Sequence, residues 1–226
     1  MALVPASDTT DGDLEPELVE VRDLYSQQSK MLALMVVLGL GAAVAVFETL
    51  APQMGVWGAA AAAVFALPLP VLAWTDLRTL RLPNKILGPT AVAWFTISMV
   101  AVVAGSLNGA DLLTGVLTGL GLGVLMFVIA VVSNGLGMGD VKFVALAGAA
   151  IGTFDPLAAV IATMILPPVL AVLGVIPLLV KFAVVQGRNP DSAKKMGQFK
   201  FAYGPYLVLG ALGGLLFAPV LTGLLL

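Results

Sequence analysis

Long apolar stretches separated by short polar segments dominate the chain from residue 31 onward. Seven stretches can be distinguished, covering roughly residues 31–51, 57–74, 86–104, 111–133, 142–154, 157–181 and 203–225. Most of them approach the ~20 residues that an α-helix needs to cross a ~30 Å hydrocarbon core. The fifth stretch is short and contains glycines, so its ends are the least sharply marked. The pattern predicts an all-α polytopic membrane protein with about seven transmembrane helices.

The first thirty residues have a different character, because seven acidic residues there face only two basic ones, Arg22 and Lys30. A secretory signal peptide would open with basic residues followed by an apolar core, so this segment is not interpreted as one. Apolar residues recur on one helical face over 13–29, which predicts a weakly amphipathic helix at the membrane surface after a disordered start. We therefore divide the chain into an acidic cytoplasmic arm, 1–30, and a transmembrane domain, 31–226.

The basic residues fall on one side of the predicted helices. If the N-terminus is cytoplasmic, all 11 Lys and Arg lie in cytoplasmic segments, and the opposite side receives only acids. Those acids are Glu48, Asp111 and Asp155. This distribution of Lys and Arg follows the positive-inside rule, by which basic residues are enriched in cytoplasmic loops. The predicted topology therefore has seven passes, with the N-terminus cytoplasmic and the C-terminus outside.

Two groups of prolines interrupt the predicted helices. Pro68 and Pro70 lie in the second stretch, and the sixth contains Pro167, Pro168 and Pro177. Proline lacks an N–H and kinks a helix, so the freed carbonyls must find other partners. We expect the bend at Pro68 and Pro70 to matter most, because it re-aims the chain just before an acid, Asp76.

The composition narrows the chemistry that the chain can perform. The chain is 60% hydrophobic and 11% charged, and it contains no cysteine and no histidine. This excludes disulfides, thiol catalysis and Ser-His or Cys-His nucleophile systems, and it removes the commonest ligand of transition metals. Catalysis would then depend on carboxylates, lysines or hydroxyls. We expect no cofactor, no bound metal and no nucleic-acid partner.

Two acids are predicted at the cytoplasmic face of the transmembrane domain. Asp76 follows the second apolar stretch, and Asp140 lies in the glycine-rich break Gly135–Lys142 after the fourth. Ionisable groups close to membrane-embedded sequence are costly, which makes them candidates for function. Two facing carboxyls in a poorly solvated site share a proton, because ionising both is unfavourable. One could take a proton from an attacking water while the other polarises a peptide carbonyl, which is acid–base hydrolysis.

Two motifs around these acids resemble those of type IV prepilin peptidases. Asp76 is followed by five residues and then Leu82-Pro83-Asn84, which resembles the family's Asp-x5-Ile-Pro-Asn with leucine in place of isoleucine. Gly137-Met138-Gly139-Asp140-x-Lys142 resembles its Gly-x-Gly-Asp-x-Lys. The segment Phe201–Tyr206 is more loosely similar to a late Pro-Phe-x-Pro-like segment. The resemblance covers about residues 57–215.

The resemblance implies a membrane aspartyl endopeptidase with Asp76 and Asp140 as its catalytic residues. It also implies that the surrounding loops support the site through Gly137, Gly139, Lys142, Pro83 and Asn84. Such enzymes remove a basic leader from prepilin-like precursors (type IV pilins, pseudopilins or Tad-type pilins), cutting beside the substrate's apolar helix at the cytoplasmic face. We therefore expect the cytoplasmic membrane of a prokaryote as the location, and the precursor and membrane lipid as partners. The missing cysteines and a short loop after Asp76 resemble the peptidase-only members, so no methyltransferase activity is expected.

Other interpretations of the two acids are open at this point. An intramembrane protease similar to presenilin or signal peptide peptidase would also carry Gly-x-Gly-Asp, although its Tyr-Asp and Pro-Ala-Leu motifs are missing here. A small proton-coupled transporter would use Asp76 and Asp140 as proton carriers, usually near the bilayer midplane. Asp140 could instead cap the following helix, since aspartate is a favoured N-cap residue. The nearby basic residues could simply anchor helix ends at the headgroups: Arg78, Arg81, Lys85 and Lys142.

The acidic arm has a predicted role of its own. Residues 8–23 lie on the same predicted side as the basic leader and would attract it, while the protein's own basic loops would repel it. Deletion of residues 1–25 should then raise the apparent KM at low salt, leave kcat nearly unchanged, and lose its effect at high salt. The alternative is that the arm pairs with the protein's own basic loops, which would make the deletion neutral or activating.

Overall fold

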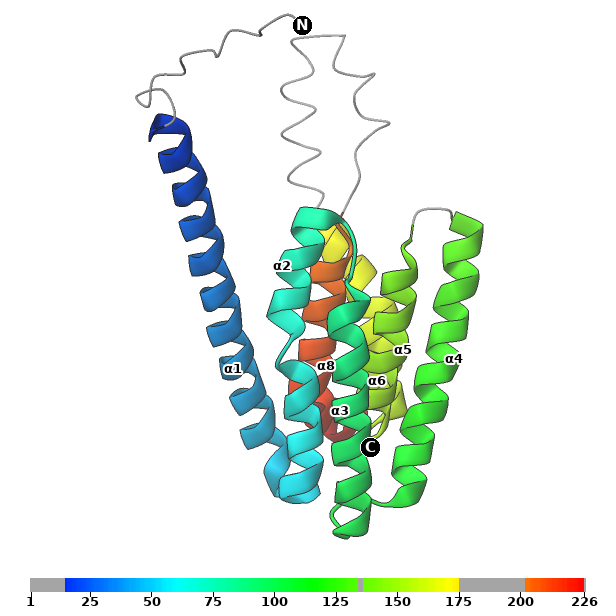
Figure 1. The fold of residues 1–226 in the computed structure, drawn as a ribbon. Helices are drawn as coiled ribbons and strands as arrows, with labels where there is room; N and C mark the ends of the chain where they lie inside the picture. The colour runs from blue at the N-terminus through cyan, green and yellow to red at the C-terminus, as the bar shows by residue number, and fades with distance from the viewer. Residues whose placement is uncertain (1–14, 134–135, 175–201, 226) are drawn as a thin grey trace, which may run out of the picture.

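The computed structural model describes residues 15–133, 136–174 and 202–225, with side chains from residue 27 to 217 within those ranges, and this part is built from helices with no strand (Figure 1). The helices are α1 (Glu15–Ala66), α2 (Leu69–Thr79), α3 (Asn84–Val103), α4 (Gly109–Ser133), α5 (Met138–Gly152), α6 (Pro156–Val160) and α8 (Gly204–Leu225). A π-helix, η1 (Ile161–Ile165), follows α6, and the chain then stays helical to Gly174. The all-α prediction is confirmed for the described residues.

Four of the described segments are long and apolar enough to cross a membrane: Gln27–Thr79, Asn84–Val103, Gly109–Ser133 and Pro156–Gly174. A shorter apolar helix covers Gly204–Phe217. The chain is therefore a multi-pass membrane protein.

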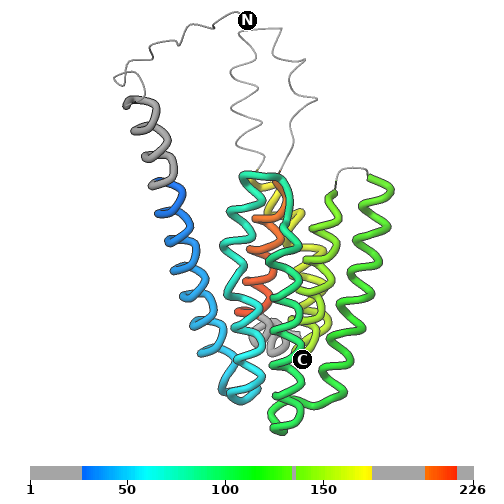
Figure 2. The backbone as a smooth tube through the Cα atoms, in the orientation of Figure 1, coloured from blue at the N-terminus to red at the C-terminus, as the bar shows by residue number. Residues whose placement is uncertain are grey.

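The first of these segments folds back on itself at Gly55. A straight helix of 53 residues would be about 80 Å long, far more than a bilayer is thick. Gly55 has φ 69° and ψ 172°, a conformation that favours glycine, and the chain reverses direction there (Figures 1 and 2). The turn falls between the first two predicted apolar stretches.

The second interruption lies at Pro68, where the sequence predicts a bend. α1 ends at Ala66 and α2 begins at Leu69, with Pro68 as the residue that precedes the new helix. Proline lacks an N–H, so it cannot continue the hydrogen bonding of α1 into α2. The predicted bend is confirmed, and it gives the eleven residues that carry Asp76 a helix of their own.

α5 lies among the other helices and contacts α1, α3, α4, α6 and α8. α4 packs against it through Gly115, Gly119 and Gly123, where an added Cβ would collide with Ala145 or Ala149 of α5. Small residues at every fourth position let two helices approach closely within a membrane. Most of α5 is consequently buried between its neighbours. This explains why its sequence is short and rich in small residues.

The start of α5 differs from the prediction. The sequence places the fifth apolar stretch at 142–154 and Asp140 in the loop before it, but the helix already begins at Met138. Asp140 therefore lies in the first turn of α5. The reason is local, because Asp140 accepts a hydrogen bond from the N–H of Gly137 and so stabilises an earlier helix start.

The N-terminal region also differs in part. α1 begins at Glu15 and continues without interruption past Lys30, so the predicted surface helix over 13–29 leads directly into the first membrane segment. Residues 1–14, which open the acidic arm, and residues 186–200, which hold four of the basic residues, lie outside the described residues. The role of the arm in substrate recruitment stays a prediction.

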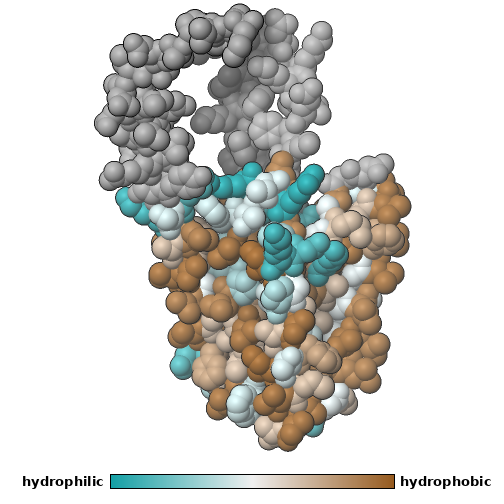
Figure 3. Space-filling model, in the orientation of Figure 1, coloured by the Kyte–Doolittle hydropathy of each residue, from teal (hydrophilic) through white to brown (hydrophobic). Residues whose placement is uncertain are grey.

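Segments that are far apart in sequence meet at one end of the bundle (Figures 1 and 2). The loop 80–83 between α2 and α3, the start of α5 and the start of α8 lie at this end, whereas the turn within α1 and the connection 104–108 lie at the opposite end. Hydrophilic side chains gather at the first end, and hydrophobic ones cover most of the rest of the visible face (Figure 3). We call the first end the polar end.

Candidate active site

Asp76 lies near the C-terminal end of α2 and is only 4% exposed. Its Oδ2 accepts a hydrogen bond of 2.8 Å from the backbone N–H of Gly204, the first residue of α8. A helix N-terminus carries a partial positive charge, so a carboxylate is stabilised there. An added Cβ at Gly204 would lie 2.6 Å from Oδ2, which leaves room only for glycine beside this acid. Asp76 thus connects α2 to α8.

Asp140 is half-buried in the first turn of α5, before the apolar part of that helix begins. Its Oδ2 accepts a hydrogen bond of 3.0 Å from the N–H of Gly137. Burial raises the pKa of Asp140 from 3.8 to about 6; the Gly137 hydrogen bond opposes this shift, and the negative charge of Asp76 adds to it.

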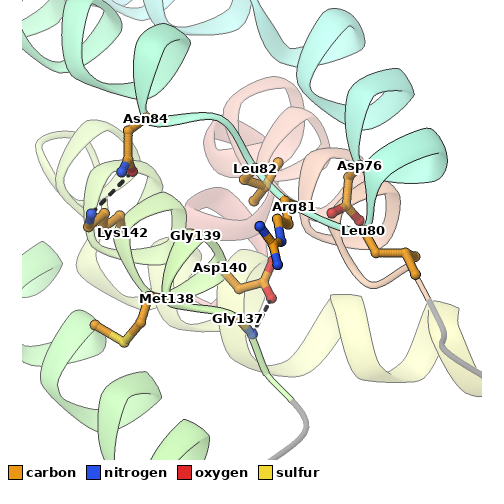
Figure 4. Close-up of a pocket in the computed structure, with 10 residues that line it drawn as sticks. All are labelled: Asp76, Leu80, Arg81, Leu82, Asn84, Gly137, Met138, Gly139, Asp140 and Lys142. Atoms are coloured by element: carbon orange, nitrogen blue, oxygen red, sulfur yellow. Dashed lines mark hydrogen bonds between the residues drawn. The ribbon is translucent and has the colours of Figure 1, made fainter.

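Both acids line one pocket of about 310 Å³ at the polar end (Figure 4). Among the described residues, the two carboxyls are not hydrogen-bonded to each other, and neither forms an ion pair with a Lys or Arg. Each instead holds the N-terminus of a different helix, Asp76 that of α8 and Asp140 that of α5. The structure therefore brings both predicted acids to one pocket, and each acid also accepts a hydrogen bond from the start of a helix.

The glycines of the second motif permit a close approach between α5 and the loop after Asp76. An added Cβ at Gly139 would lie 2.9 Å from the Cβ of Leu82 and 3.1 Å from its carbonyl oxygen. Gly137 precedes α5 in an extended conformation, and its own Cβ position lies 3.4 Å from Asp140 Oδ2. The two motifs thus pack against each other, and both contribute walls to the pocket.

Pro83, Asn84 and Lys142 connect the starts of two helices. Pro83 precedes α3 in an extended conformation. The Lys142 amine donates a hydrogen bond of 3.1 Å to Asn84 Oδ1 across 58 residues of sequence (Figure 4). The amine is therefore directed toward the first motif, and we infer that it orders the pocket wall. Arg81 also lines the pocket, whereas the guanidinium of Arg78 lies 4.3 Å from the ring centre of Trp74.

A third segment reaches both acids and is missing from the predicted site residues. Gly204 donates its N–H to Asp76, and the preceding Tyr203 has its pKa raised to about 12, first by burial and then by the charge of Asp140. The signal in the sequence is the segment Phe201–Tyr206, which resembles the family's late motif only loosely. Its sequence could not identify the backbone N–H of Gly204 as the contact, because that contact joins residues separated by 128 positions.

The fold and the site together define a class of protein. It is a helical, multi-pass membrane protein with two carboxyls in one pocket at its polar end. The sequence model of the type IV leader peptidase family matches residues 63–175, half of the chain, and both acids lie inside the match. The chain therefore belongs to the type IV leader peptidase family and is a peptidase. The resemblance is confirmed, and the match is consistent with a short, peptidase-only form. No curated protein and no solved structure matches the chain.

Proposed function

We propose that this protein is a membrane aspartyl endopeptidase that removes the basic leader from prepilin-like precursors at the cytoplasmic face of a prokaryotic membrane. The observation that carries the proposal is the pairing of Asp76 and Asp140 at one pocket, within electrostatic reach of each other, in a member of the leader peptidase family. With no histidine or cysteine in the chain, these carboxyls are the strongest candidates for acid–base groups at this pocket.

The hydrogen bonds at the two acids leave one oxygen of each available for chemistry. Asp76 and Asp140 each use Oδ2 for a helix N-terminus, and Oδ1 of each has no protein partner among the described residues. One carboxyl, ionised, takes a proton from water as the water oxygen attacks the peptide carbonyl carbon. The other, protonated, donates to the carbonyl oxygen. Collapse of the tetrahedral intermediate breaks the C–N bond, and the leaving nitrogen takes up a proton.

The orientation follows from the charges. We infer seven passes, because this number puts all 11 basic residues on the side that holds the pocket. The positive-inside rule then makes that side cytoplasmic, and the N-terminus with it. The polar end is then the cytoplasmic end. A precursor that presents its leader in the cytoplasm and its apolar helix in the membrane would place its scissile bond at the depth of the two acids. Their position at the end of the bundle also argues against a transporter, whose site would lie near the midplane.

Co-expression with a prepilin-like precursor tests the proposal. The precursor should shift in gel mobility by the mass of its leader only when this protein is present, and mass spectrometry of the product should locate the cut between the basic leader and the apolar helix. Membranes without this protein serve as the control. A panel of such precursors that stays intact beside correctly inserted protein would overturn the proposal.

A further inference from the structure

Arg81 lines the pocket of the two acids, and its side chain has no partner among the described residues. The side chain is exposed, and in the view of Figure 4 it extends between Asp76 and Asp140. The other basic residue of the pocket, Lys142, already donates to Asn84. The N–H donors of the Arg81 guanidinium are therefore open to a molecule that enters the pocket.

The turn after α2 holds the backbone of Arg81 in place. Leu80 has φ 53° and ψ 34°, and among the described residues it alone, apart from glycines, has a positive φ. This conformation is unfavourable for leucine, and such backbone strain clusters at active sites. On the other side of Arg81, Leu82 is only 6% exposed and packs against Gly139. The hydroxyl of Thr79 also donates a hydrogen bond of 3.1 Å to the Arg81 carbonyl oxygen, so the turn presents Arg81 at a fixed position.

The charge of Arg81 is not used to neutralise the two acids. Asp76 accepts its hydrogen bond from Gly204 and Asp140 accepts its own from Gly137, and within the described part of the chain neither acid forms an ion pair. The pKa of Asp140 is raised, chiefly by burial, whereas a guanidinium in contact with it would lower that pKa. The positive charge of Arg81 is consequently available to a substrate.

We propose that Arg81 binds a main-chain carbonyl oxygen of the substrate beside the scissile bond and so positions the peptide for the two acids. The inference rests on the proposed function and adds a substrate-binding residue to it. Any peptide in this pocket brings carbonyl oxygens, which accept hydrogen bonds from a guanidinium. A carboxylate of the substrate fits less well, because the ionised member of the acid pair would repel it in the same pocket.

Replacement of Arg81 tests the proposal. Arg81→Met removes the donors and keeps a long side chain at an exposed position, so folding should persist. We expect KM for a prepilin-like precursor to rise about tenfold or more, with kcat within about twofold of the wild type. Arg81→Lys keeps the charge without the fork of donors and should recover part of the loss. The matched control is Arg78→Met, because Arg78 is also exposed but lies over Trp74 outside the pocket, and KM should stay unchanged there.

Binding without cleavage gives a second readout. In an Asp140→Asn background, which leaves the precursor uncut, fluorescence anisotropy of a labelled precursor should give a Kd that Arg81→Met raises by about the same factor as KM. A precursor whose Asp and Glu near the cut are replaced by Asn and Gln separates the two possible substrate groups. The loss caused by Arg81→Met should persist with this precursor, since its main-chain carbonyls are unchanged.

The outcomes separate the two proposals. A KM and a Kd that Arg81→Met leaves unchanged would show that Arg81 only anchors a helix end at the headgroups, and would overturn this inference alone. A loss confined to kcat, or one that disappears with the neutralised precursor, would also overturn it, by assigning Arg81 to the transition state or to a substrate carboxylate. Precursors that wild-type protein never cleaves would instead overturn the proposed function.

Discussion

Replacement of Gly204 by alanine should damage the site through its effect on Asp76. The added Cβ would lie 2.6 Å from Oδ2 and 2.7 Å from Cγ of that acid, closer than real Cβ atoms approach. Either the carboxyl or the start of α8 must shift, and the 2.8 Å hydrogen bond between them is lost or lengthened. A misplacement of ~1 Å in a catalytic group costs ~10²-fold in rate, so we expect kcat to fall by one to two orders of magnitude.

The assay is steady-state cleavage of a prepilin-like precursor, with kcat and KM determined separately. KM should change little, because Gly204 contacts the catalytic acid itself. The control is Gly88→Ala on α3, an exposed position where an added Cβ meets nothing within 4 Å. The double variant Asp76→Asn/Gly204→Ala should be no slower than Asp76→Asn alone, since both changes act on one group. A Gly204→Ala protein with wild-type kcat would refute the reasoning.

Three further predictions concern protons, metals and the pocket wall. Because burial raises the pKa of Asp140 from 3.8 to about 6, its protonated form contributes stability that is complete below pH 3.8 and is lost as pH rises through about 6. The Tm should therefore fall between about pH 4 and pH 6, level off above about pH 7, and fall less in Asp140→Asn; an identical pH dependence in both proteins would contradict this. EDTA should leave cleavage intact, because two carboxylates without His or Cys hold a divalent ion only weakly; loss of activity restored by added Mg²⁺ would contradict this. Lys142→Gln keeps a donor for Asn84 and should retain most activity, whereas Lys142→Met should lower kcat/KM several-fold, by ~0.5–1.5 kcal/mol. Equal losses in both Lys142 variants would assign its role to charge.

Much of the fold could be predicted because membrane helices are encoded locally. Apolar stretches mark the helices, and Pro68 marks a break, since a missing N–H acts on its own helix. The turn at Gly55 could be placed only as a gap between two stretches, because glycine is permissive in many conformations and its φ is not written in the sequence. The apolar stretch 142–154 predicts too late a start for α5, because the first turn of the helix, from Met138 to Asp140, is not part of that stretch.

The site was predictable in its residues but not in its contacts. Asp76 and Asp140 could be placed at one face from topology and charge. The capping of α8 by Asp76 and the bond between Lys142 and Asn84 join segments 128 and 58 residues apart, so no local pattern reports them. For the same reason the close approach of η1 to α8 was not predicted, because it brings the carbonyl of Ala162 against Gly210, 48 positions later in the chain.

The most direct measurement is cleavage by Asp76→Asn and Asp140→Asn, because both acids also cap helices. Asparagine keeps an oxygen that can accept the N–H of Gly204 or Gly137, so each substitution preserves the capping contact and removes the titratable proton. We predict that each variant stays inserted with a Tm near that of the wild type and loses ~10²–10⁴-fold or more in cleavage rate. Cleavage near the wild-type rate in either variant would show that the acid serves only as a helix cap, and would contradict the two-carboxylate mechanism.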